Sequence, residues 1–100
     1  MVDKFLIPGD HPSLQGHFPG NPVVPGVVIL NEVVSLIEKK FTNRLVMGIK
    51  FIKFVRPLRP DSEVVLHVEE NAVDTLNITC EDGDNVLVKG QLVLSGKDVA

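Results

Sequence analysis

Apolar residues follow a helical period in the first half of the chain and a strand period after it. From residue 25 to residue 41 apolar side chains recur every three or four positions, and Pro25 suits the first turn of a helix. We therefore predict a helix over residues 25–41. Its buried stripe is predicted to consist of Val27, Leu30, Val34, Ile37 and Phe41, widened by Val28, Val33 and Leu36.

Beyond residue 44 apolar and polar residues alternate, as is typical of half-buried strands. An acidic, glycine-containing cluster at 81–85 predicts a hairpin turn. One helix with one strand before it and four after it predicts an α+β domain, an antiparallel sheet curled around a long central helix. The predicted strands cover residues 3–7, 45–55, 63–69, 73–80 and 86–94.

Length and composition fit a single domain spanning residues 1–100, with 44% hydrophobic and 23% charged residues. The longest apolar run, residues 23–30, is interrupted by Pro25 and Gly26 and is too short to cross a bilayer. The N-terminus lacks the pattern of a signal peptide. A single cysteine, Cys80, excludes a disulfide within the chain. We expect a cytoplasmic protein that binds no membrane, with Cys80 in its core.

Charge is distributed unevenly along the chain. The net charge is −3, yet no acidic residue lies between Lys39 and Arg59, and the chain turns acidic beyond Pro60. Such a basic segment is either a docking surface for an anionic partner or a solvated face without a partner. Nucleic acid is not expected as that partner, because the chain has no Trp or Tyr for stacking.

The residues before the helix contain a histidine among prolines and glycines. Proline fixes φ and glycine opens other backbone conformations, so residues 16–27 are predicted to form a rigid loop that places His17 near the helix. An imidazole can both accept and donate a proton near neutral pH. The first N–H groups of the helix, from Gly26 and Val27, lack partners within the helix and can clamp a thioester carbonyl.

This segment resembles the signature of the β-hydroxyacyl-acyl carrier protein dehydratases of the FabZ and FabA type, which have the hot-dog fold. Their signature reads His-Phe-Pro, two residues, Pro, two residues and Pro-Gly-Val. It matches His17-Phe18-Pro19, Pro22 and Pro25-Gly26-Val27. A weaker resemblance covers residues 53–61, which are similar to the strand end of that family that carries phenylalanine, a basic residue and Arg-Pro.

The resemblance implies dehydration of 3-hydroxyacyl thioesters, carried on acyl carrier protein, to trans-2-enoyl thioesters. Fatty-acid-like synthesis and polyketide or polyene synthesis both use this step. His17 would be the base that removes the α-proton, and Phe18 and the apolar residues of the helix would line the acyl tunnel. Pro25, Gly26 and Val27 would bind the thioester at the start of the helix.

The same resemblance implies a dimer joined through edge strands, with the histidine of one chain and a helix acid of the other in each site. We expect a homodimer, and the sequence leaves open a complex with a different hot-dog chain. Lys53, Arg56 and Arg59 are predicted to dock the acidic carrier protein. His11 is interpreted as a turn residue and His67 as an exposed strand residue. No cofactor is expected, and no spacing of ligands supports a metal site.

One departure from the family concerns the helix acid, which lies fourteen positions after the histidine in the family and is replaced here by Asn31. Glu32 follows, but one residue on a helix is a rotation of about 100°. Either Asn31 serves differently, or a helix irregularity brings Glu32 round, or the chemistry has changed. A carboxamide does not release a proton near neutrality, so His17 would have to carry the proton itself.

Three functions therefore remain at the level of sequence. The first is a dehydratase that works without the usual acid. The second is a subunit that binds acyl chains, or partners a dehydratase, without catalysis. The third is an acyl thioesterase on the same fold, in which Asn31 would orient a water.

Overall fold

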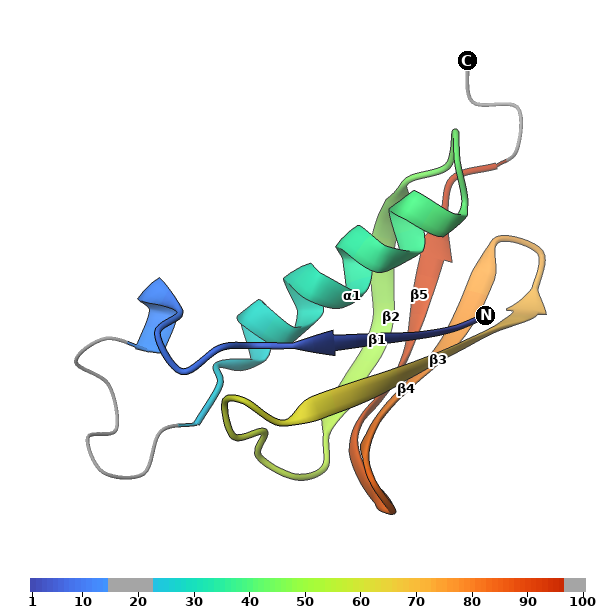
Figure 1. Cartoon of the computed structure of the whole chain (residues 1–100). Coiled ribbons are helices and arrows are strands. Elements are labelled where there is room, and N and C mark those ends of the chain that lie inside the picture. Colours follow the sequence, from blue (N-terminus) through green and yellow to red (C-terminus); the bar gives the residue numbers. More distant parts are fainter. Residues whose placement is uncertain (15–22, 97–100) are drawn as a thin grey trace.

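The computed structural model describes residues 1–14 and 23–96, and this part of the chain forms one sheet, one α-helix and a short 3₁₀ turn (Figure 1). In chain order the elements are β1 (Val2–Leu6), η1 (Pro12–Leu14), α1 (Gly26–Lys40), β2 (Val46–Phe54), β3 (Glu63–Ala72), β4 (Thr75–Asp82) and β5 (Asn85–Leu94).

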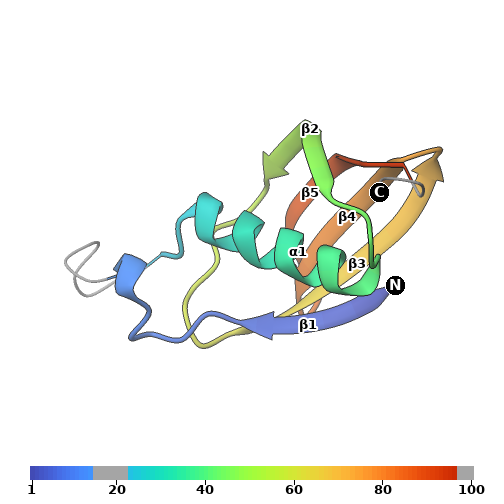
Figure 2. The ribbon, with the colours of Figure 1, turned by 90° about the horizontal axis from the view of Figure 1, so that it is seen from above.

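The five strands form one antiparallel sheet in the order β1-β3-β4-β5-β2. Strands β3, β4 and β5 follow one another as hairpins, and the short β1 and the long β2 are the two edges. Helix α1 lies against one face of the sheet, flanked by β1 and β2 when seen from above (Figure 2). The predicted antiparallel sheet with one helix is confirmed. The predicted wrapping of the sheet around a long central helix is not confirmed, because α1 has 15 residues and lies against one face of the sheet.

Alternation along the central strands builds the core beneath the helix. The predicted inward positions of β3 and β4 are buried, and Leu66 and Cys80 have no exposed surface. The same face of β5 adds Val88, Leu92 and Leu94. Period-two alternation therefore predicted the buried face of these strands correctly.

The buried stripe of the helix differs from the predicted one. Ile29, Val33 and Ile37, spaced four residues apart, face the sheet, whereas Val27 is 63% exposed and Val34 only partly buried. Of the predicted residues, Ile37 and the widening residue Val33 are fully buried. Because almost every side of this helix carries a Val, Ile or Leu, several stripes fit the spacing equally well, and packing on the sheet selects one.

The turn between β3 and β4 is also shorter than predicted. β3 continues to Ala72, and Val73, predicted to begin a strand, is 89% exposed in the turn. Asp74 adopts a positive φ of 62°, which aspartate tolerates better than most residues. A two-residue hairpin turn therefore replaces the longer connection.

No helix among residues 1–14 and 23–96 has both the length and the apolar content needed to cross a membrane.

Candidate functional site

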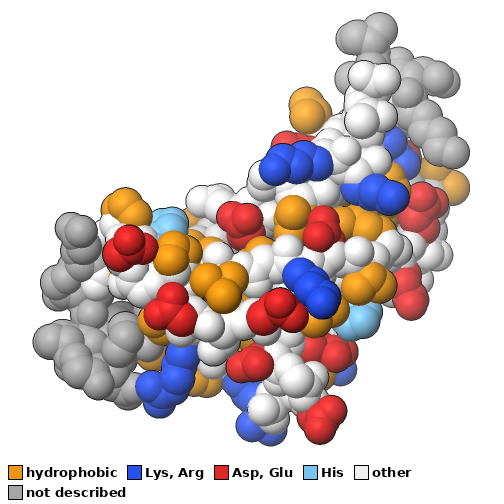
Figure 3. Space-filling view, viewed as in Figure 1, with side chains coloured by type: hydrophobic (Ala, Val, Ile, Leu, Met, Phe, Trp, Pro, Cys, Tyr) orange, Lys and Arg blue, Asp and Glu red, His pale blue; other side chains and the backbone are white. Residues whose placement is uncertain are grey.

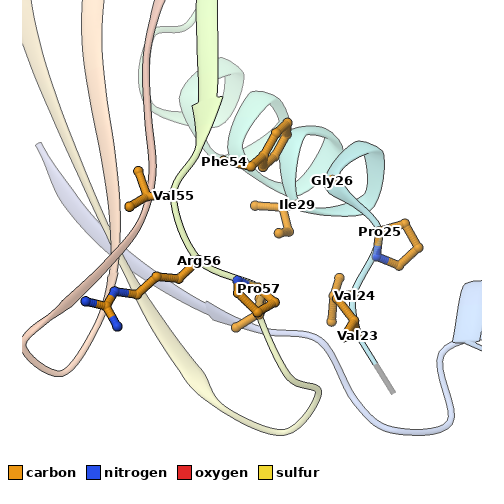
Figure 4. A pocket seen from close by; sticks show the side chains of 10 residues that line it. Val23, Val24, Pro25, Gly26, Ile29, Phe54, Val55, Arg56 and Pro57 are labelled. Atoms are coloured by element: carbon orange, nitrogen blue, oxygen red, sulfur yellow. The ribbon is translucent and has the colours of Figure 1, made fainter. Parts of the chain in front are cut away.

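An apolar cavity of about 470 Å³ lies at the N-terminal end of α1. Its wall comes from the segment that enters the helix and from the end of β2 with the residues that follow it (Figure 4). These are the two stretches in which the sequence resembles the dehydratase signature. The lining residues are Val23, Val24, Pro25, Gly26, Ile29, Phe54, Val55, Arg56, Pro57 and Leu58.

The first turn of the helix borders this cavity through Pro25, Gly26 and Ile29. Pro25 is the N-cap, with φ −59° and ψ 143°, and its carbonyl accepts hydrogen bonds from the N–H groups of Val28 (3.0 Å) and Ile29 (3.3 Å). The N–H groups of Gly26 and Val27 precede these bonds, and no side chain of the described residues caps the helix. The positive end of the helix dipole therefore lies beside an apolar space.

Gly26 is required here because the ring of Phe54 lies against it. A Cβ built on Gly26 would be 2.7 Å from Cζ of Phe54 and 2.9 Å from its Cε1. Real Cβ atoms do not come so close, so any larger residue at position 26 must displace the ring. Phe54 is 50% exposed and forms one wall of the cavity.

The segment after β2 is fixed to β5 and to the helix entry. Leu87 is an extra residue in β5, because Cys80 pairs with Val88 and Glu81 with Val86. The carbonyl of Leu87 accepts hydrogen bonds from the N–H groups of Val55 (2.7 Å) and Arg56 (3.3 Å).

The buried Leu58 continues this attachment. Its carbonyl accepts a hydrogen bond of 2.8 Å from the N–H of Val24, which is also buried. The entry to α1 and the segment after β2 are thus joined by a hydrogen bond between two residues that line the cavity.

Of the predicted site residues, His17 and Phe18 lie outside the described part of the chain. Of the three residues predicted to bind the thioester, Pro25 and Gly26 line the cavity, whereas the exposed Val27 is not part of its wall.

The two candidates for the acid do not line this cavity in a single chain. Asn31 is exposed and borders a shallow hollow on the outer side of α1 together with Val34, Ser35 and Glu38, and Glu32 is partly buried. The carboxylate of Glu38 accepts a hydrogen bond of 2.9 Å from the N–H of Val46, which gives it a structural role.

The predicted docking residues Lys53, Arg56 and Arg59 are all exposed. Arg56 and Arg59 border a common hollow, which Lys53 does not. Arg44, which belongs to the same basic segment, is only 8% exposed and pairs with Asp74 at 2.6 Å, so it is not part of a docking surface.

Acidic and basic side chains intermingle on the face seen in Figure 3, so the basic segment of the sequence does not form one block of charge there.

Cys80 and His67 lie outside the wall of this cavity. Burial raises the pKa of the Cys80 thiol to about 12, which makes it inert near neutral pH. His67 lies 3.7 Å from Glu81 in a partly exposed pair on the outer face of the sheet. No group of three metal-ligating side chains occurs within residues 1–14 and 23–96.

The sequence did not single out Phe54 and Leu58 as parts of the site. A signal existed for Phe54, because it belongs to the second stretch that resembles the dehydratases. Its contact with Gly26 joins residues 28 positions apart, and period and spacing do not determine such a contact.

The model of the ApeI-like family, described as ApeI dehydratase, matches residues 1–91. The chain belongs to the ApeI-like dehydratase family. The dehydratase resemblance inferred from residues 16–30 is therefore confirmed. The match extends beyond the signature to most of the domain.

Curated relatives of this ApeI-like chain are FabZ proteins. It is 37% identical over 76 residues to the 3-hydroxyacyl-[acyl-carrier-protein] dehydratase FabZ of Chloroflexus aggregans, covering 68% of this chain and 53% of the relative. FabZ of Ehrlichia chaffeensis is 30% identical over 97 residues, covering 91% and 66%. The chain thus spans about half to two thirds of the length of these relatives.

Among solved structures, the dehydratase heterocomplex ApeI:P from Xenorhabdus doucetiae contains a similar chain. The TM-score is 0.80 at 21% identity, and the match covers 93% of this chain and 84% of the other. At that identity the match establishes the hot-dog fold.

Proposed function

We propose that this ApeI-like chain dehydrates 3-hydroxyacyl thioesters to trans-2-enoyl thioesters. One observation carries the proposal: the dehydratase signature ends at the start of α1, where Pro25 and Gly26 line an apolar cavity. A thioester carbonyl at Gly26 would accept hydrogen bonds from this helix end, which stabilises the enolate formed when the α-proton leaves. The acyl chain would occupy the space beside Ile29 and Phe54.

His17 is the proposed base, assigned by its place in the signature. Its imidazole takes the α-proton, and the C–H electron pair moves into the bond between C2 and C3 through the enolate. The C3–O bond then breaks, and the hydroxyl leaves as water with a proton returned by the imidazolium. The step needs no oxidant or reductant, because one molecule of water is the only product besides the enoyl thioester.

Asn31 is proposed to orient the leaving hydroxyl rather than to protonate it. A carboxamide donates a hydrogen bond without releasing its proton, so one group does the work that two share in the family. Loss of a general acid costs about 10²- to 10⁴-fold in rate. We therefore expect a slow dehydratase.

A homodimer is proposed to complete the site. Strand β2 is an edge of the sheet, and an edge strand presents N–H and C=O groups with which a further strand can pair. Its alternate side chains are apolar and about half exposed or more, which a second β2 would cover. They are Met47 (65%), Ile49 (51%) and Phe51 (50%), and Leu45 (55%), just before the strand, continues the row.

Asn31 lies on the exposed side of α1 in a single chain. It would reach an active site only across such an interface, as the family's shared sites imply. A complex with a different hot-dog chain would also bring Asn31 to an active site across an interface.

The proposed substrate carrier is acyl carrier protein in the cytoplasm, in fatty-acid-like or polyketide synthesis. The exposed Lys53, Arg56 and Arg59 support docking of an acidic carrier, because they lie at the end of β2 and in the segment after it, which borders the cavity.

The experiment is incubation of the protein with a 3-hydroxyacyl-carrier protein, followed by mass spectrometry of the acyl arm. We expect the loss of one water, abolished in His17→Ala and accelerated in Asn31→Glu. An unchanged arm across several chain lengths would contradict the proposal.

A second function is favoured by one observation, the replacement of the family acid by Asn31. It is a subunit that binds acyl thioesters without converting them. In that case the wild-type protein and His17→Ala would both bind the acyl-carrier protein, and Asn31→Glu would not restore water loss. Release of a free acid would indicate a thioesterase instead.

A further inference from the structure

Strand β1 forms the second edge of the sheet, on the side opposite β2. Figure 2 shows it along the border of the molecule, and within residues 1–14 and 23–96 it pairs with β3 alone. Its outer face carries the exposed apolar side chains of Val2 (64%) and Leu6 (48%). A further strand can add to a sheet at such an edge. The residues between Val2 and Leu6 therefore decide whether β1 accepts one.

The pairing of β1 with β3 shows which backbone groups point to the open edge. Met1 and Val68 exchange two hydrogen bonds, each of 2.9 Å. Hydrogen-bonded pairs alternate along an antiparallel ladder, so the next pair of this kind contains Asp3. The backbone groups of Lys4 are then directed away from β3, in the middle of the strand.

The N–H of Lys4 is already occupied within the chain. It donates a hydrogen bond of 2.8 Å to the carboxylate Oδ1 of Asp3. By alternation Asp3 shares the inner face of the sheet with the buried Phe5, yet Asp3 itself is exposed. A charged side chain on the inner face of an edge strand opposes the addition of another strand. A strand that adds to β1 must also displace the Asp3 carboxylate from Lys4.

Like charges would meet if two β1 strands paired with each other. Two copies related by a twofold axis pair their strands antiparallel, and directly opposite residues lie on the same face. An axis at Lys4 sets two ammonium groups opposite each other, and an axis at Asp3 sets two carboxylates opposite each other. Directly opposite like charges destabilise a pair of strands.

The β2 edge has a different character. It has nine residues, compared with five in β1, and it exposes the uncharged side chains of Met47, Ile49 and Phe51. If two chains pair through β2, both outer edges of the dimer are β1 strands. Pairing of β1 with β1 would then join dimers into a sheet that has no closed end.

We propose that Asp3 closes the β1 edge to a second copy of the chain, so that the sheet extends through β2 alone and assembly stops at two chains. The number of chains rests on the proposed homodimer. The closure of β1 rests on the contacts and charges of β1 itself.

The test compares Asp3→Val with Asp84→Val by sedimentation velocity over a range of concentrations. Both variants exchange one carboxylate for the same apolar side chain, but Asp84 lies in the exposed turn between β4 and β5. Asp3→Val frees the N–H of Lys4 and removes the opposed carboxylates. We expect it to form species larger than those of the wild-type protein at concentrations about tenfold or more below those that Asp84→Val requires.

Hydrogen–deuterium exchange then identifies the strand that makes the contact. The amides of β1 should become protected in Asp3→Val as its concentration rises, because a new strand accepts their hydrogen bonds. Equal association of the two variants would overturn the proposal, as would association without protection of β1.

Failure of the proposed homodimer has a different signature. A monomeric wild-type protein, with an Asp3→Val variant that associates through β1, would reject the homodimer and retain the closure of β1. A dimeric wild-type protein, with an Asp3→Val variant that is no larger, would do the reverse.

Discussion

At the scale of single residues, Gly26 and Phe54 form the contact that shapes the cavity. A methyl group at position 26 would overlap the ring, which is half exposed and can move into the cavity. The cost would therefore appear in substrate binding and turnover more than in stability. This contact connects the two stretches of the dehydratase resemblance.

We predict that Gly26→Ala lowers the rate of dehydration by on the order of ten- to a hundredfold, because a displaced ring misplaces the thioester. The melting temperature should change little. The double variant Gly26→Ala with Phe54→Leu has room for the methyl group and should recover part of the activity. Equal loss of rate in the single and double variants would show that the ring does not transmit the effect.

Cys80 provides a test of the core that is independent of function. Its pKa rises from 9.0 to about 12 through burial, so the folded state holds the thiol proton more tightly than the unfolded state. This contribution to stability is fully present below pH 9 and is lost as the pH rises through 12.

The predicted result is a steeper fall of the unfolding free energy between pH 9 and pH 12 in the wild-type protein than in Cys80→Ala. The difference in slope should approach about 1.4 kcal/mol per pH unit. Urea denaturation at several pH values measures it. Parallel curves for the two proteins would contradict the burial of the thiol.

The residue types of the signature could be read from the sequence, but the orientation of side chains on the helix could not. Val27 was expected to be buried and is exposed, while Ile29 was not part of the predicted stripe and is buried. A helix that is apolar on nearly every side gives no preferred phase. Packing against the sheet decides which side of the helix is buried, and the spacing of apolar residues along the chain does not reveal that packing.

At the scale of elements, a group of polar contacts joins the end of α1, the β3–β4 turn and the end of β5. The Nε of Arg44 donates to the carbonyl of Ser95 at 2.8 Å, and its Nη2 contacts Asp74 at 2.6 Å. The Ser95 hydroxyl accepts the N–H of Leu45 at 2.8 Å. Because Arg44 is nearly buried, its charge depends on these partners.

Asp74→Asn is expected to lower the unfolding free energy by about 1–3 kcal/mol, because it removes a charge that Arg44 needs and keeps a residue that tolerates positive φ. Thermal or urea denaturation is the measurement. Asp84→Asn, in the exposed β4–β5 turn, is the matched control and should stay within about 0.5 kcal/mol of the wild-type protein. Equal effects of the two substitutions would contradict a structural role for the pair.

The order and type of the elements followed from the sequence because the period changes clearly after the helix. Residues 85–94 form a strand close to the predicted range, and the helix ends within one residue of the prediction at each side. The extra residue Leu87 could not be foreseen, because a bulge depends on the pairing partner. It is this bulge that holds Arg56 at the site.

At the scale of the whole molecule, the exposed apolar side of β2 is the feature that a single chain leaves unexplained. Ile49→Lys places a charge in the proposed interface and should shift the protein towards monomer, because burying an unpaired charge is costly. Val73→Lys is the matched control, since Val73 is more exposed but lies in the β3–β4 turn. Sedimentation velocity measures the difference. Unchanged association in Ile49→Lys would exclude this edge as the interface.

The central claim is reversible addition and removal of water at a site that lacks the usual helix acid. Its most direct measurement is the incubation of a trans-2-enoyl-carrier protein in ¹⁸O-labelled water, followed by mass spectrometry of the acyl arm. We predict that the arm gains one labelled water and that His17→Ala abolishes this gain. An arm that stays unchanged with the wild-type protein, or that is released as a labelled free acid, would contradict the claim.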